Sequence, residues 1–385
     1  MHLLFVNYTD FAGPSGIHIF HLANALFDLK ITSTVLVPKK AASISIFGDP
    51  KFDVVSFNEA RKKLGHQKPQ LIHAWTPRES TRWMTERLSR LLGIPYIVHL
   101  EDNEEAILVS YFDTPFKVLK LWRKLKISIM LKYKPLPHPK RYKRFIANAS
   151  GATLIIDRLK TLVPSHMPMT VIWPACEEGV FSMPPEPDMC IRDKLGVSHQ
   201  DIVLTYPGNV HQANVQDVET LYKAVQLCRK KGVKTSLIRI GQDHARFSTD
   251  FSSMVGDCIL ELGDLDPKEI PTYLRAADIL VQPGRPNAFD EYRFPSKLPM
   301  FLASGRPVIL ANVNLAHYLT DGHNAIVLKG GTAEEMAEAI EKLARSPEKR
   351  VMIGKAGRGF ARQHFSWSRT AKEVLAFYNS VLKKD

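Results

Sequence analysis

Short apolar runs rich in β-branched residues alternate with amphipathic runs of helical period along the whole chain. In the first half, these runs predict strands at residues 3–6, 33–38, 71–74, 96–100, 153–156 and 170–173. In the second half, they predict strands at residues 201–206, 235–240, 279–282, 307–311 and 325–328. Strands that alternate with helices form parallel sheets covered on both faces, so the pattern indicates two doubly wound α/β domains.

A proline-rich stretch, residues 183–187, separates the two series of strands. Such stretches are frequent at domain boundaries because few contacts need to cross them. A chain of 385 residues also suits two domains of ordinary size. With 45% hydrophobic and 24% charged residues, the composition is that of a soluble globular protein and excludes the collagen-like, disulfide-dense and disordered classes.

Targeting signals and cysteine spacing indicate the cellular compartment in which the protein is expected. No window approaches the roughly 18 uncharged apolar residues of a membrane span, and the first residues lack the basic region and cleavage site of a signal peptide. The four cysteines include no C-x-x-C pair, which argues against a disulfide framework and against structural zinc. We therefore expect a cytoplasmic protein with reduced thiols.

Basic residues are concentrated in one segment. The formal net charge is +13, and residues 117–144 hold eleven Lys or Arg with no Asp or Glu. The first part of this segment has an apolar helical stripe and the following candidate contact residues: Lys120, Trp122, Arg123, Lys124 and Lys126. A basic amphipathic helix with a tryptophan is typical of a segment that lies on the anionic inner face of a membrane. A helix packed on the sheet gives the same pattern.

The second part of the basic segment, residues 132–144, contains three prolines and predicts a basic loop. No array of stacking aromatics and no binding module accompanies the charges. Nucleic acid is therefore not an expected partner.

Ligands of doubly wound sheets bind beyond the carboxyl ends of the strands, where His99, Glu101 and Asp102 follow one strand as candidate catalytic groups. An extended backbone places His99 and Glu101 on one face and Asp102 on the other, so all three serve one site only if the strand ends first. The next two acidic residues, Glu104 and Glu105, are typical of the start of a helix.

A glycine follows the first strand in the same way. Gly16 opens an apolar helix, where a bare backbone gives an anionic or sugar ligand access to N–H groups; a tight strand-to-helix turn explains the same glycine. We expect the surface around Gly16, His18 and His99 to contact a substrate.

Three strand ends of the second half also carry glycine and polar side chains. Gly208 and Asn209 follow one strand, Gly241 follows the next, and Arg285 lies after a third. Further along, Ser296 is a plausible N-cap with Lys297 in the first helical turn. A helix N-terminus beside a cation predicts a diphosphate site.

Five segments resemble motifs of the retaining glycosyltransferases of family 4. They are residues 171–181 (VIWPACEEGVF), 204–209 (LTYPGN), 262–265 (LGDL) with 273–283 (YLRAADILVQP), 294–308, and 365–367 (FSW). Each motif alone is weak, but their order along nearly the whole chain is specific. The resemblance implies a GT-B fold, in which two Rossmann-like domains face each other across a cleft.

The resemblance also implies a division of labour. Residues 1–175 would form the acceptor domain, joined by a crossover helix within residues 366–385, and residues 176–365 would bind a nucleotide-diphosphate sugar. The partners would be that donor and a sugar or lipid-linked acceptor, for example a cell-surface glycan precursor. Transfer would need no cofactor and no metal, and the chain has no Asp-x-Asp motif that would indicate one.

The chain departs from the family at the donor site. The family usually has two glutamates eight positions apart, and Tyr292 and Met300 occupy those positions here. Glu291 is adjacent to the first position and could replace that glutamate. The basic pair that usually contacts the diphosphate falls near two asparagines, Asn209 and Asn214, so Lys297, Arg293 or Arg285 would have to supply the charge.

These departures leave two further functions open. The first is a non-catalytic or impaired binding or scaffold protein with the same fold, because both glutamates are absent. The second is a nucleotide-sugar epimerase, which would need carboxylates placed for proton abstraction. The sequence gives no clear set of such carboxylates.

Overall fold

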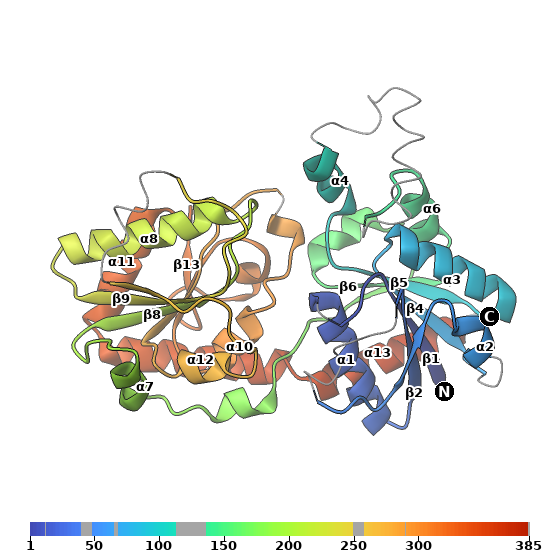
Figure 1. Cartoon of the computed structure of the whole chain (residues 1–385), viewed down its shortest axis with the longest axis horizontal. Helices are drawn as coiled ribbons and strands as arrows, with labels where there is room; N and C mark the ends of the chain where they lie inside the picture. Colours follow the sequence, from blue (N-terminus) through green and yellow to red (C-terminus); the bar gives the residue numbers. More distant parts are fainter. Residues whose placement is uncertain are drawn as a thin grey trace. The chain divides into compact units, whose positions relative to one another are not determined.

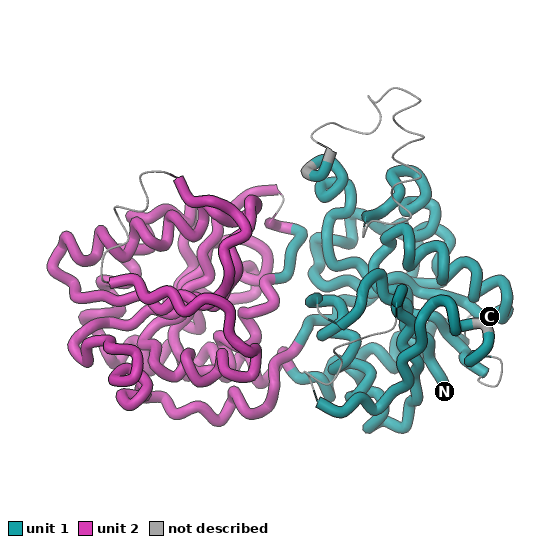
Figure 2. Tube along the Cα trace, in the orientation of Figure 1, with its two compact units in different colours: residues 1–174, 292–294, 366–385 teal, residues 175–291, 295–365 magenta. Residues whose placement is uncertain are grey.

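The computed structural model describes residues 1–11, 13–39, 48–64, 68–112, 136–248, 258–288 and 290–383 (Figure 1). The chain divides into two compact units, which Figure 2 colours separately. Unit 1 comprises residues 1–174, 292–294 and 366–385, and unit 2 comprises residues 175–291 and 295–365. The division falls after Pro174, and the terminal helix belongs to unit 1.

Unit 1 is built on a seven-stranded parallel sheet with the order β3-β2-β1-β4-β5-β6-β7. Its strands are β1 (His2–Asn7), β2 (Thr32–Val37), β3 (Asp53–Ser56), β4 (Leu71–Trp75), β5 (Tyr96–Leu100), β6 (Gly151–Leu154) and β7 (Met169–Val171). Its described α-helices are α1 (Pro14–Asp28), α2 (Ala60–Lys63), α3 (Glu79–Leu92), α4 (Glu104–Phe112), α6 (Arg141–Ala147) and α13 (Trp367–Leu382).

The central strands of unit 1 are buried on both faces, as their continuous apolar runs predict. Leu3 and Phe5 of β1 contribute to a core that includes residues of α1 and α13. Leu4 is equally buried and faces the other side of the sheet, because side chains alternate along a strand. The helix α3 packs against β4 and β1.

Unit 2 contains a six-stranded parallel sheet with the order β10-β9-β8-β11-β12-β13. The strands are β8 (Ile202–Pro207), β9 (Thr235–Ile240), β10 (Ile259–Glu261), β11 (Ile279–Gln282), β12 (Val308–Ala311) and β13 (Ile326–Leu328). The α-helices are α7 (Met189–Lys194), α8 (Val215–Lys230), α9 (Ile270–Leu274), α10 (Leu298–Ala303), α11 (Ala333–Ala344) and α12 (Pro347–His364). The α/β fold with two parallel sheets agrees with the predicted fold class.

Two edge strands were not predicted from the sequence. They are β3, with the sequence DVVS, and β10, with the sequence ILE. Each is short and has at most one buried residue, so the apolar run that marks the central strands is missing. Pairing with a neighbouring strand, and not local composition, determines their conformation.

The proline-rich stretch, residues 183–187, lies within unit 2 and is fixed to it by Arg306. The guanidinium of Arg306 donates hydrogen bonds to the carbonyls of Pro184 (2.8 Å), Pro185 (2.6 Å) and Glu186 (2.9 Å). It also donates to Ala277 O at 2.7 Å. The stretch is therefore not a free linker, and the change of unit occurs before it.

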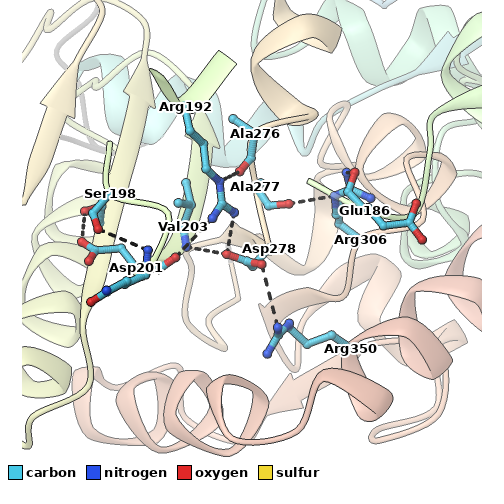
Figure 3. Close-up of polar contacts among 12 residues, drawn as sticks. Glu186, Arg192, Ser198, Asp201, Val203, Ala276, Ala277, Asp278, Arg306 and Arg350 are labelled. Atoms are coloured by element: carbon cyan, nitrogen blue, oxygen red, sulfur yellow. Dashed lines mark hydrogen bonds and ion pairs between the residues drawn. The ribbon is translucent and has the colours of Figure 1, made fainter. Parts of the chain in front are cut away.

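Arg306 belongs to a buried ionic group at the amino ends of β8 and β11, which we call the amino-end cluster: Arg192, Asp278 and Arg306 (Figure 3). Arg192 donates to Asp278 Oδ2 at 2.7 Å and to Ala276 O at 2.9 Å. The same Asp278 oxygen accepts the backbone N–H of Val203 at 2.8 Å. This cluster joins the starts of two neighbouring strands.

Candidate functional site

Two loops meet at the carboxyl ends of β8 and β9 in unit 2. Gly208 donates its N–H to the carbonyl of Ile240 at 2.6 Å. Gly241 has a φ of +128°, and a Cβ there would lie 2.7 Å from both Gly208 O and Asn209 Oδ1. A Cβ on Gly208 would lie 2.5 Å from the hydroxyl oxygen of Tyr206. Both glycines are therefore required for the close approach of these loops.

Lys297 lies against the same loops. Its Nζ is 5.5 Å from the centre of the Tyr206 ring and 3.1 Å from the position that a Cβ of Gly208 would occupy. The structure thus brings together four predicted donor-site residues: Gly208, Asn209, Gly241 and Lys297. An ammonium beside closely packed glycines is suited to a phosphate group.

The predicted cap of α10 is wrong. The helix begins at Leu298 with Lys297 in the N-cap position, and Ser296 is exposed and precedes the cap. Pro299 lies in the first turn, where its missing N–H costs no helical hydrogen bond. Since α10 has only six residues, the cation is a stronger argument for an anion site than the helix end.

The asparagines that replace the family's basic pair shape the loop after β8. Asn209 Oδ1 accepts the N–H of Gln242 at 2.9 Å. Asn214 donates from Nδ2 to Asn209 O at 3.0 Å and accepts the N–H of His211 at 2.6 Å. Both amides are used within the protein, so neither replaces a diphosphate-binding cation.

Three other predicted donor residues have charged partners of their own within the protein. Arg285 forms an ion pair with Asp217 at 3.1 Å. Burial raises the pKa of Asp217 to about 6, against the opposing effect of Arg285. Glu291 accepts from His317 Nε2 at 3.0 Å. Arg293 belongs to unit 1, where its Nε lies 4.0 Å from Asp102.

The two positions of the missing glutamates belong to different units. Tyr292 belongs to unit 1, where the guanidinium of Arg158 lies 5.8 Å from the centre of its ring. Met300 lies in α10 of unit 2 and is partly buried. Neither position provides a carboxylate.

In unit 1, Glu101 follows β5 and is fully engaged. It accepts hydrogen bonds from Ser15 Oγ and from Trp75 Nε1 at 2.8 Å, and its contact with His18 Nδ1 is 3.3 Å. Burial opposes ionisation, but the hydrogen bond and charge of His18 outweigh it, together with His99 and Ser15, and lower the pKa of Glu101 to about 2. This carboxylate ties the start of α1 to the end of β4 and is poorly suited to donate a proton.

His99 lies inside the same region with one ring nitrogen unpaired. Its ring is 4.1 Å from that of Trp75, and its Nδ1 is 2.9 Å from Thr153 Oγ1. Its buried Nε2 has no hydrogen-bond partner and lies 4.0 Å from Glu101. Burial lowers the pKa of His99 to about 4, partly offset by Glu101, so the imidazole is neutral at pH 7.

Asp102 belongs to a separate group at this edge, which we call the carboxyl-edge cluster: Arg78, Asp102 and Glu104. Arg78 lies 3.3 Å from Asp102 Oδ2 and 3.7 Å from Glu104 Oε1, and its guanidinium stacks 4.1 Å from the ring centre of Tyr8. Because β5 ends at Leu100, Asp102 is free of the strand alternation, yet it turns to Arg78 and not to His99.

Glu104 differs from what its sequence position predicts. It begins α4 as expected, but its side chain is buried, and both of its oxygens and Arg78 Nε lack hydrogen bonds. Burial raises the pKa of Glu104 to about 8; Arg78 opposes this shift and Asp102 reinforces it. Burial also raises the pKa of Asp102, with Arg78 opposing. Glu105 is exposed and pairs with Lys143 at 2.9 Å.

Gly16 has a structural explanation. It lies in the first turn of α1, and a Cβ there would be 2.5 Å from Phe11 Cα and 2.6 Å from Asp10 O. The space is used by the protein's own backbone and gives no room for a ligand at this point. Its neighbour His18 is buried against Glu101.

Most of the basic segment falls outside the described residues, including the five contact residues named for it. Its described end is helical, since α6 begins at Arg141. The expected loop is therefore wrong for residues 141–144, because the last of the three prolines is Pro139 and the chain beyond it is free to form a helix. Over the described parts of the chain, no helix has the length and apolar character needed to cross a membrane.

Within the described ranges, no group of three or more His, Cys, Asp or Glu is arranged to hold a metal ion. The four cysteines are free.

Comparison with known proteins places these observations in a family. Residues 201–346 match the family described as Glycosyl transferases group 1. The D-inositol 3-phosphate glycosyltransferase of Stackebrandtia nassauensis is 24% identical over 252 residues, covering 62% of this chain and 54% of that protein. The enzyme of the same name from an Arthrobacter species is 23% identical over 352 residues, covering 86% of this chain and 75% of its own.

The match extends to solved structures. That of Anabaena Alr3699/HepE in complex with UDP superposes with a TM-score of 0.74 at 16% identity, covering 99% of this chain and 100% of that one. At this identity the likeness shows the fold alone. The chain spans about half the length of the Stackebrandtia relative. Residues 201–346 of this chain therefore form a domain of the glycosyl transferases group 1 family, within a chain that has the GT-B fold.

Proposed function

We propose that this chain is a retaining glycosyltransferase that moves a sugar from a nucleotide-diphosphate donor to a sugar or lipid-linked acceptor. The observation that carries the proposal is Lys297 packed against Gly208 and Tyr206, at the carboxyl end of β8 in the matched domain. The name of the Anabaena structure states that its protein was crystallised with UDP, which supports a nucleotide donor of this kind.

Lys297 gives this site its chemistry. As the sugar leaves, negative charge grows on the diphosphate, and a fixed ammonium stabilises it. Lys297 lies against Gly208 and Tyr206, whereas Arg285 pairs with Asp217 and Arg293 belongs to unit 1, and this position favours Lys297 for the role. Retention of configuration is supported only by the resemblance to family 4 motifs.

Unit 1 would supply the acceptor side through the neutral imidazole of His99 and the carboxyl-edge cluster. The Nε2 of His99 has no hydrogen-bond partner, and in the neutral tautomer that carries its proton on Nδ1 it can accept a hydrogen bond from an acceptor hydroxyl. Burial raises the pKa of Asp102 and raises that of Glu104 to about 8, so Glu104 can exchange a proton near neutral pH.

Calorimetric titration with UDP-, GDP- and dTDP-sugars tests the donor site. We expect micromolar binding of one donor and a roughly 10- to 150-fold loss in Lys297→Ala, equivalent to about 1.5–3 kcal/mol for a hydrogen bond to a charged group. Lys355→Ala removes an exposed lysine of α12 in the same unit and should leave affinity unchanged. Binding of no donor by the wild-type chain would favour the scaffold alternative, for which the absent glutamates at Tyr292 and Met300 are the motivation.

Peripheral membrane contact of a cytoplasmic protein through residues 117–144 is part of this proposal, and the contact rests on the basic and amphipathic sequence of that segment. We expect co-sedimentation with phosphatidylglycerol vesicles at low salt and its loss at high salt. The variant with Lys120, Arg123, Lys124 and Lys126 changed to Gln should remain in the supernatant. Recovery of the wild-type chain in the supernatant with and without vesicles would contradict membrane contact.

A further inference from the structure

A large groove lies between α3 and α6 of unit 1, two helices that run side by side in Figure 1. Its volume is about 490 Å³, and its charged and amide lining consists of Arg82, Arg90, Arg141, Arg144, Glu86 and Asn148. Tyr96, the first residue of β5, also lines it. The groove therefore reaches the amino end of that strand, away from His99 and the carboxyl-edge cluster.

Positive charge exceeds negative charge in the groove. Glu79 is buried beside it and accepts two hydrogen bonds from Arg82, at 2.7 and 2.8 Å, and one from Arg141 at 3.0 Å. Glu86 accepts from Arg82 at 2.5 Å. These two carboxylates face four guanidinium groups, which leaves an excess of two positive charges.

Arg90 and Arg144 carry that excess. Within the part of the chain that the structure describes, no carboxylate lies within 4.0 Å of either guanidinium. Arg90 donates from Nε to the backbone carbonyl of Glu86 at 3.0 Å, which fixes its stem along α3 while its other N–H groups stay available. Both side chains are exposed at the groove.

The groove offers donors and almost no acceptors. Both Glu86 and the hydroxyl of Tyr96 are used within the protein, the latter as a donor to Phe145 O at 2.8 Å. Arg141 is positioned by Glu79, so one donor is already oriented before any ligand binds. The amide of Asn148 adds a neutral donor. Such a set matches an anion with several oxygens, since guanidinium forks bind phosphate in a bidentate manner.

We propose that the α3–α6 groove is a second anion site that binds a phosphomonoester, independent of the donor site in unit 2. A phosphomonoester carries nearly two negative charges at neutral pH, which equals the excess in the groove. The same group occurs on soluble sugar or glycerol phosphates and on lipid headgroups. The inference goes beyond the proposed function, because neither sugar transfer nor donor binding requires it.

Two paired variants test the proposal in the full-length chain. Arg90→Gln with Arg144→Gln removes one charge from each helix inside the groove. Arg87→Gln with Lys143→Gln removes one charge from the same two helices outside it; Arg87 lies over the ring of Trp83, and Lys143 pairs with Glu105. The readouts are calorimetric titration with glycerol 3-phosphate and co-sedimentation with phosphatidylcholine vesicles that contain or lack phosphatidic acid.

We expect the groove variant to bind a phosphomonoester at least about tenfold more weakly than wild type, and the outside variant to stay within about twofold. Lys297→Ala should match wild type, which separates this site from the one in unit 2. Binding of the soluble ester assigns a free phosphate, whereas the same pattern with vesicles alone assigns a lipid headgroup. Equal losses in the two paired variants, or no binding of either probe by the wild type, would overturn the proposal.

Discussion

The amino-end cluster of unit 2 and the carboxyl-edge cluster of unit 1 both bury arginines beside carboxylates, but they differ in how completely these groups are satisfied. In the first, no buried side-chain nitrogen or oxygen of Arg192, Asp278 or Arg306 lacks a hydrogen bond. In the second, Arg78 Nε and both oxygens of Glu104 have none. The first cluster lies where strands begin, and the second lies where ligands of such sheets bind.

The difference separates a structural role from a role at a site. A buried ion pair is retained at low cost only if the remaining donors and acceptors are paired, as they are around Asp278. Around Glu104 the protein leaves donors and acceptors unpaired, and burial keeps the acid protonated up to about pH 8. A carboxyl group in that state can exchange a proton or accept a new partner when a ligand arrives.

Removal of the central carboxylate of the amino-end cluster should have the largest effect. Asp278→Ala leaves Arg192 buried with a charge that it cannot lose, and breaking such a pair costs about 3–5 kcal/mol of the free energy of unfolding. Urea denaturation followed by circular dichroism measures the loss. Asp193→Ala breaks an exposed pair with His199 and should cost under about 1 kcal/mol. A similar small loss in both variants would contradict the structural role of the amino-end cluster.

Removal of the cation from the carboxyl-edge cluster should lower the free energy of unfolding less than Asp278→Ala does, and the loss should depend on pH. In Arg78→Gln, Asp102 and Glu104 lose their positive neighbour, but both can take up protons, so we expect a loss of about 1–3 kcal/mol that grows from pH 5 to pH 8. Denaturation at the two pH values measures it. Arg87→Gln, on the exposed side of α3, is the control and should be neutral at both. A loss independent of pH would mean that these carboxyl groups are already ionised.

Glu104→Gln tests the raised pKa directly. The ordinary value for a glutamate is 4.5 and the folded value is about 8, so the folded state keeps a proton that the unfolded chain releases in between. Stability should therefore fall as pH rises through this window in the wild type and not in the variant. At pH 6 we expect the variant to be more stable by about 2 kcal/mol, because the folded acid is still protonated there and each pH unit above the ordinary pKa of 4.5 is worth about 1.4 kcal/mol. Glu105→Gln should follow the wild-type curve; an identical curve for Glu104→Gln would show an ordinary carboxylate.

The sequence predicted the fold well where local and tertiary signals agree. The strands that carry the site are continuous apolar runs, and β5, β9 and β11 were predicted with their observed bounds. The edge strands β3 and β10 were missed because they bury little and depend on their neighbours. The cap of α10 was misplaced by one residue, because the helix begins at Leu298 without a side-chain cap and Ser296 stays exposed before it.

The candidate site was predicted in part, and for a physical reason. Glycines and a lysine after successive parallel strands must lie at one edge, so Gly208, Gly241 and Lys297 could be grouped from sequence. The burial of Glu104 could not be predicted, because an acidic residue in the first turn of a helix is ordinary whether it is exposed or buried. It depends on Arg78, which lies 26 positions earlier and meets it only in the folded chain.

The smallest expected change in stability concerns His99, and it sharpens the comparison within unit 1. His73 is also buried, but both of its ring nitrogens have partners, Tyr378 at 2.7 Å and Thr153 at 2.8 Å. His99→Phe keeps a ring beside Trp75 and leaves Thr153 its bond to His73, so we expect a change under about 1 kcal/mol. His73→Phe leaves the Tyr378 hydroxyl without its partner and should cost about 1–3 kcal/mol of the free energy of unfolding.

If the unpaired Nε2 of His99 serves the acceptor, His99→Phe should lower the turnover of sugar transfer at least about tenfold, since a positioned acid–base or polar group contributes that much or more. The rate is measured with the donor that the wild-type chain binds. Unchanged turnover in a folded His99→Phe chain would show that His99 has a structural role only.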